Sequence, residues 1–201
     1  MKTLSKKLLP LTLFGIAVTS LFCVRPAQAY TVTLQQMGAN VVANGSGAFN
    51  LTGLTFFSGD FVVPQMNASF GAILTGQVLG GVVTGYTGFT GPTSFGPGGF
   101  FSPSLAAETL SAFRAVLHAL YVPQGYVSNT ALSNSMTFNS ATLDSLGVTP
   151  GTYVWSWGTG LPNQNFTLII GGAGVPDGGS TVSLLGYGLL GLAALRRKLA
   201  C

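Results

Sequence analysis

Hydrophobic and polar residues alternate in several short stretches of this chain. Residues 30–34 read YTVTL, residues 152–157 read TYVWSW and residues 165–170 read NFTLII. Alternation with a period of two is typical of a β-strand that buries one face. The last two stretches flank the turn-rich sequence GTGLPNQN, so together they predict a β-hairpin.

Turn residues divide the rest of residues 30–174 into similar segments. The stretches AFNLTGLTF (48–56) and GAILTG (71–76) also favour strands, and Pro150 with Gly151 predicts a turn before the hairpin. Many short strands separated by Gly, Pro, Asn and Ser predict a single, mainly β domain with a sandwich-like architecture.

One segment departs from this pattern. In residues 104–121, five apolar residues recur at helical spacing: Ala106, Leu110, Phe113, Leu117 and Leu120. This spacing predicts an α-helix with Ser102 as its N-cap and Pro103 in its first turn. A shorter helical turn is predicted from Thr142 to Leu146, ending at Gly147. We therefore expect one or two short helices beside the strands.

Residues 84–101, TGYTGFTGPTSFGPGGFF, are low in complexity, with aromatic residues between glycines. This composition favours a flexible loop over a binding surface.

The aromatic row of the predicted hairpin allows two interpretations. On a strand, its three residues share one face: Tyr153, Trp155 and Trp157. Exposed rings would offer a platform for sugars and make the domain a carbohydrate-binding module, whereas buried rings would fill the core of a sandwich. We favour the core and keep carbohydrate binding as the alternative function.

The first 29 residues are typical of a secretory signal peptide. They have a basic start, an apolar run from Leu8 to Val24 and the small-residue tripeptide Ala27-Gln28-Ala29. Signal peptidase is expected to cut between Ala29 and Tyr30. The cut removes Cys23, so Cys201, the last residue, is the one cysteine left. The exported domain, residues 30–174, then contains no thiol for a disulfide, a metal site or a nucleophile.

The chain closes with three short segments in order. Residues 175–179 read VPDGG, residues 181–195 are apolar and uncharged, and three basic residues follow: Arg196, Arg197 and Lys198. As a helix the apolar segment spans about 22 Å, less than the ~30 Å of a bilayer core, which makes it a marginal transmembrane helix. The basic residues are expected to stay on the cytoplasmic side of the inner membrane and leave the domain outside.

These segments resemble the C-terminal sorting signal of PEP-CTERM proteins, in its VPDSG-like variant. The resemblance implies that residues 175–201 are recognised and cut by an exosortase, a membrane-embedded transpeptidase-like enzyme of bacteria that make extracellular polysaccharide. It assigns recognition to the motif residues: Val175, Pro176, Asp177, Gly178 and Gly179. The motif departs from the commoner form, because Val-Pro-Asp-Gly-Gly replaces Val-Pro-Glu-Pro. A glycine-rich linker before an ordinary membrane anchor is the alternative.

The charges exclude nucleic acid as a partner of the domain. Seven of the eight basic residues lie within the first 25 residues or at positions 196–198. Between residues 30 and 174 Arg114 is the one basic residue, set against Asp60, Glu108 and Asp144. No basic patch is therefore available to hold a phosphate backbone.

Residues for catalysis are scarce as well. His118 is the one histidine of the chain, and on the predicted helix it lies about 10 Å along the axis from Ser111, too far for a nucleophile and its base. The carboxylates show no spacing typical of metal ligands, and no phosphate-binding loop is present. We therefore expect no enzyme activity, no metal and no cofactor, with a hydrolase acting through His118 as the weakest alternative.

The leading hypothesis is a non-catalytic exported protein with a structural or adhesive role. It would be sorted by an exosortase to the cell surface or to the extracellular polysaccharide matrix. Extracellular polysaccharide is then the candidate ligand of the domain.

Overall fold

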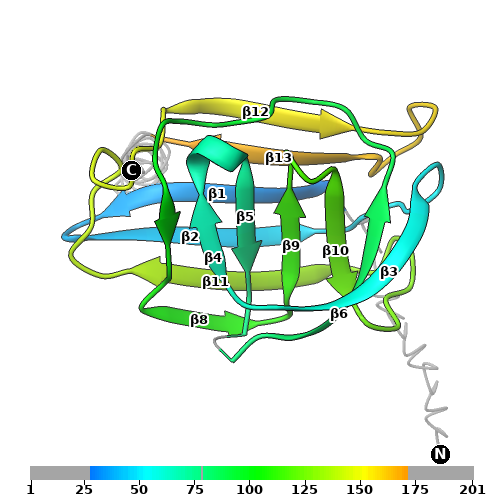
Figure 1. The fold of residues 1–201 in the computed structure, drawn as a ribbon, viewed down its shortest axis with the longest axis horizontal. Helices are drawn as coiled ribbons and strands as arrows, with labels where there is room; N and C mark the ends of the chain where they lie inside the picture. The colour runs from blue at the N-terminus through cyan, green and yellow to red at the C-terminus, as the bar shows by residue number, and fades with distance from the viewer. Residues whose placement is uncertain (1–27, 78, 172–201) are drawn as a thin grey trace, which may run out of the picture.

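A computed structural model describes residues 28–77 and 79–171 of the chain. These residues form two β-sheets that pack face to face, and the strands of one sheet run across those of the other (Figure 1). The predicted mainly β, sandwich-like domain is therefore confirmed.

The first sheet contains both ends of the described chain. Its six strands, in spatial order, are β12 (Gly151–Ser156), β13 (Asn165–Ile170), β1 (Tyr30–Met37), β2 (Asn40–Gly47), β11 (Leu132–Phe138) and β8 (Leu105–Glu108). The first strand and the last strand pair in parallel, whereas the other neighbours are antiparallel.

The second sheet is antiparallel and is built from the middle of the chain. Its seven strands, in spatial order, are β3 (Thr55–Val62), β6 (Gly81–Thr87), β10 (Ala119–Pro123), β9 (Ser111–Arg114), β5 (Ala72–Thr75), β4 (Gln65–Asn67) and β7 (Phe100–Phe101). The short 3₁₀ helix η1 (Ala68–Phe70) joins β4 to β5, and the Asn67 side chain caps it.

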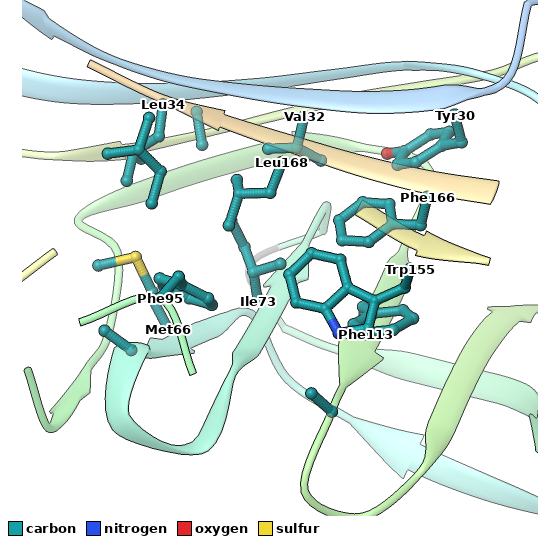
Figure 2. Packing of buried hydrophobic residues seen from close by; sticks show 14 of the residues in the cluster. Tyr30, Val32, Leu34, Met66, Ile73, Phe95, Phe113, Trp155, Phe166 and Leu168 are labelled. Atoms are coloured by element: carbon teal, nitrogen blue, oxygen red, sulfur yellow. The ribbon is translucent and has the colours of Figure 1, made fainter. Parts of the chain in front are cut away.

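A cluster of aromatic residues fills the space between the sheets (Figure 2). Phe113 of the second sheet packs with its ring centroid 4.7 Å from those of Trp155 and Phe166 in the first sheet. Leu34, Leu168, Met66 and Ile73 extend the same core. These residues occupy alternate positions in their strands, so one face of each sheet supplies the core.

The predicted helix at residues 104–121 is wrong. This segment forms β8, β9 and β10, and it passes from one sheet to the other between β8 and β9. Glu108 lies where the chain changes sheet and His118 lies in the turn between the antiparallel strands β9 and β10, and both have positive φ, 69° and 49°. Ser102 and Pro103 lie in the loop before β8. The helical spacing of apolar residues arose because β9 is buried on both faces, which hides the period of two.

The helical turn predicted from Thr142 to Leu146 is present as a single turn. The Leu146 amide donates to the Thr142 carbonyl at 3.0 Å, and Gly147 follows with φ of 61°. The Val148 amide then bonds to the Leu143 carbonyl, which closes a Schellman motif.

Two further segments differ from expectation. Residues 48–54 form a loop before β3 because the Asn50 side chain accepts the Thr52 amide and starts a turn. Residues 88–99 follow no regular pattern, yet Phe89 and Phe95 are buried in the core. The glycine-rich segment is therefore a packed connection, and a Cβ at Gly91 would collide with the Trp155 ring.

We predict that Phe113→Ala lowers the free energy of unfolding by about 3–5 kcal/mol, because it leaves a cavity where the two sheets meet. Urea denaturation followed by tryptophan fluorescence measures the change, since both tryptophans lie in this core. Phe100→Ala is the control, because Phe100 is 60% exposed at a sheet edge. An equal loss in the two variants would contradict the assignment of Phe113 to the core.

Candidate functional site

The aromatic row of β12 faces the core. Trp155 is fully buried, Trp157 is 5% exposed and Tyr153 is partly buried. The Trp155 indole N–H donates to the Pro92 carbonyl at 2.6 Å, and the Trp157 indole N–H donates to the Asn50 carbonyl at 2.7 Å. The rings therefore offer no exposed platform for sugars. The alternative interpretation, in which these three residues form a carbohydrate-binding face, is therefore wrong, because this face of β12 packs into the core between the sheets.

His118 lies in the tight turn between β9 and β10, exposed, with its ring centroid 6.1 Å from that of Phe89. Ser111 is 3% exposed and lies inside the sandwich. The two residues therefore do not lie on one helix: Ser111 belongs to β9 and His118 to the turn after it. The Ser111 hydroxyl of the second sheet donates to the Tyr30 hydroxyl of the first sheet at 2.9 Å, and the two belong to a buried cluster of polar side chains.

That polar cluster links both sheets at the start of β1. Asn134 of β11 donates to the Ser111 hydroxyl at 2.9 Å, and Thr75 of β5 lies 3.2 Å from the same hydroxyl. Gly45 makes room, because a Cβ there would overlap the Tyr30 and Asn134 side chains. Four strands thus meet through three hydroxyls and one amide, which fixes the register of β1 in the core.

Burial strongly affects the phenol of Tyr30. Removal from water raises its pKa above the ordinary value near 10, while the hydrogen bond from Ser111 acts in the opposite direction. Burial also raises the pKa of Tyr121 and of Tyr126. The neutral phenol is therefore the form that the folded chain holds.

The predicted signal peptidase site ends in this buried position. Ala27 lies outside the described residues, Ala29 pairs with Ala48, and Tyr30 is 1% exposed. The Tyr30 amide donates to the Ala48 carbonyl at 3.1 Å. A protease needs an extended and accessible peptide, so cleavage before Tyr30 requires a chain that has not yet folded.

Two of the hollows on the described part of the surface are lined by residues of the sandwich. One, of about 370 Å³, opens beside the β12–β13 turn and is lined by neutral residues that include Ser156, Leu161 and Asn165. The other, of about 250 Å³, lies beside β7, with Phe70, Phe100 and Arg114 in its wall. The Arg114 guanidinium lies 5.6 Å from the centroid of the Tyr121 ring. Within the described ranges, no three His, Cys, Asp or Glu side chains gather as metal ligands.

The end of β13 determines where the chain leaves the sandwich. The Gly171 amide donates to the Leu34 carbonyl at 3.1 Å, which is the last bond described on this strand. Only residues 172–174, Gly-Ala-Gly, separate Gly171 from the VPDGG sequence. The motif residues 175–179, the segment 181–195 and the basic residues 196–198 lie outside the described residues. Within the ranges that are described, no helix has the length and hydropathy to cross a bilayer.

Residues 174–199 match the family model of the VPDSG-CTERM motif. The chain therefore ends in a PEP-CTERM-like sorting signal, which confirms the resemblance found in the sequence. No curated protein and no solved structure matches the chain.

We predict that stability falls with pH above about 10 and that Tyr30→Phe reduces this fall. Below pH 10 the phenol is protonated in the folded and the unfolded chain; above it the unfolded chain loses a proton that the folded chain keeps. Each such group lowers the free energy of unfolding by about 1.4 kcal/mol per pH unit until its folded pKa is reached.

Urea denaturation between pH 8 and pH 11.5 measures this slope. Ser111→Ala is the matched control, because it breaks the same hydrogen bond but keeps the phenol, so it should be less stable at pH 8 and retain the alkaline fall. Equal slopes in Tyr30→Phe and the unaltered chain would show that Tyr30 does not cause the fall.

Proposed function

We propose that this chain is a non-catalytic surface protein that an exosortase-type enzyme sorts to the cell surface or to the extracellular polysaccharide matrix. The match of residues 174–199 to a sorting motif is the observation that carries this proposal. In this function the domain has a structural or adhesive role.

The order of events follows from the buried start of β1. Signal peptidase removes residues 1–29 while the chain is still extended. The sandwich then folds outside the inner membrane, because β1 and β13 must both be available to complete the six-stranded sheet. The apolar segment at 181–195 holds the folded domain at the membrane until the sorting enzyme acts.

The short connection to the motif limits how the enzyme approaches. Three residues, 172–174, separate Gly171 from Val175, so the motif begins four residue steps, or about 14 Å at most, from the last strand bond. Gly171 itself lies beside Leu34 of β1 and Pro150, at the end of the sandwich that holds the β1–β2 turn and residues 139–149. Gln36 ties these two loops together by donating to the Ala141 carbonyl and accepting the Leu143 amide. The enzyme therefore meets a braced end of the domain.

The motif residues are tested by Asp177→Ala combined with Gly178→Ala. The unaltered protein should be recovered with an intact mass that begins at Tyr30 and ends between residues 175 and 179. The double variant should stay in the membrane fraction and keep the basic tail. Asp144→Ala is the control, because Asp144 is exposed in a loop outside the motif. Equal release of the double variant would refute sorting through this motif.

The connection is tested by deleting residues 172–174. The deletion places Val175 directly after Gly171, whose amide belongs to the sheet, so we expect processing to slow by about tenfold or more. Replacing the same residues by three serines keeps the length and should preserve processing. Intact mass measured over time after synthesis gives both rates. If the deletion and the serine variant are processed equally fast, the enzyme does not need this spacing.

A further inference from the structure

An apolar strip on the inner face of the seven-stranded sheet is left uncovered. On this face Leu120 and Val122 of β10 are fully buried beneath the six-stranded sheet. Register places Tyr86 opposite Leu120 and Phe56 opposite Tyr86, so Phe56 shares the face of the core. Phe56 is nevertheless 60% exposed. The cover provided by the first sheet therefore ends before β3.

A β-bulge in β3 places two of its phenylalanines on the same face of the sheet. Phe56 and Phe61 are five positions apart and would point to opposite faces of a regular strand. The register shift between Phe56 and Ser58 inserts one residue, so Phe61 faces the same side and lies opposite Val82. The inserted Phe57 turns to the other face, where its ring meets that of Tyr121 with centroids 6.0 Å apart. Phe61 is 60% and Val82 is 55% exposed.

β3 is also an edge strand. It pairs with β6 on one side, and its other side carries backbone groups without a neighbouring strand among the described residues. Asp60 is its one charged residue, and its carboxylate accepts the Phe61 amide at 2.7 Å. A long apolar edge with one charge is a template for pairing with another strand.

We propose that β3 is the interface through which two copies of this chain form a symmetric dimer. The two edges pair antiparallel about a two-fold axis between Ser58 and Gly59, which brings Phe56 of each copy beside Phe61 of the other. Each β3 has one free edge, so the contact closes at two copies. The resulting assembly has one continuous sheet across both sandwiches.

The exposed area is sufficient for this assembly. Phenylalanine side chains bury about 150–250 Å² each. The exposed parts of Phe56, Phe61 and Val82 on the core face, with those of Phe57 on the other face and Val63 just after the strand, offer roughly 500 Å² on each copy. Two copies then bury roughly 1,000 Å², about the lower limit for a specific interface. The strand carries no basic residue, which disfavours a polyanion as the occupant.

The apolar segment of the same chain is a poorer occupant. The chain leaves the sheet at Gly171, beside the end of β1, whereas β3 lies toward the other end of the long axis (Figure 1). Nine residues, 172–180, precede the apolar segment and reach about 30 Å at most, little more than the ~27 Å length of β1 alone.

Cysteine cross-linking in the full chain tests the proposal. The background carries Cys23→Ser and Cys201→Ser, and Ser58→Cys then places a thiol beside the two-fold axis. Mild oxidation should give a covalent dimer on a non-reducing gel. Thr152→Cys is the control, because Thr152 is exposed on β12, an edge of the other sheet. It should give at least tenfold less dimer.

A second pair of variants separates the apolar contact from chance collision. Added to Ser58→Cys, Phe61→Asp should lower the dimer yield at least tenfold, whereas Phe100→Asp should leave it unchanged. The two phenylalanines are equally exposed, at 60%, on opposite edges of the same sheet. Equal yields from the Ser58 and Thr152 variants, or from the two aspartate variants, would overturn the proposal. With Cys201 retained, a disulfide between position 58 and Cys201 of one chain would also overturn it, because the tail would then be the occupant.

Discussion

β1 and β13, the first and last strands of the described chain, pair in parallel within the six-stranded sheet. Parallel strands need a long connection between them, and here the connection is the rest of the domain. The sheet cannot close until the last strand has been made. The same pairing buries Tyr30 at one end of β1 and holds Gly171 at the other, so both processing sites predicted for this chain lie next to one pair of strands.

The core joins the two sheets through aromatic rings and a polar cluster that serve different purposes. The packing of Phe113 against Trp155 and Phe166 supplies apolar burial where the sheets cross. The hydroxyls of Tyr30, Ser111 and Thr75 with the Asn134 amide add directed bonds that a shifted register would break. Apolar packing favours many arrangements of two sheets, and the polar bonds select one of them.

The two ends of the sandwich have different roles in the proposed function. The end near Gly171 carries the connection to the sorting motif and is braced by Gln36. β3 lies toward the other end, with the apolar edge that the first sheet leaves uncovered. A domain held by its C-terminus therefore presents this edge away from its attachment, where a second copy can reach it.

Local patterns in the sequence determined the parts of this protein that depend on neighbouring residues alone. Alternation predicted the β12–β13 hairpin, and Gly147 predicted the end of the helical turn that begins at Thr142. The order of motif, apolar segment and basic residues identified the sorting signal. Only the tertiary structure decided residues 104–121, because β9 lies between two apolar clusters and both of its faces are buried. The tertiary structure also decided which aromatic residues are exposed. Trp155 and Phe61 both occupy strands, but Trp155 of the six-stranded sheet is covered by the seven-stranded sheet, whereas Phe61 of the seven-stranded sheet lies beyond the cover that the six-stranded sheet provides. How far one sheet extends over another depends on contacts between residues that are distant in the sequence, so no local pattern records it.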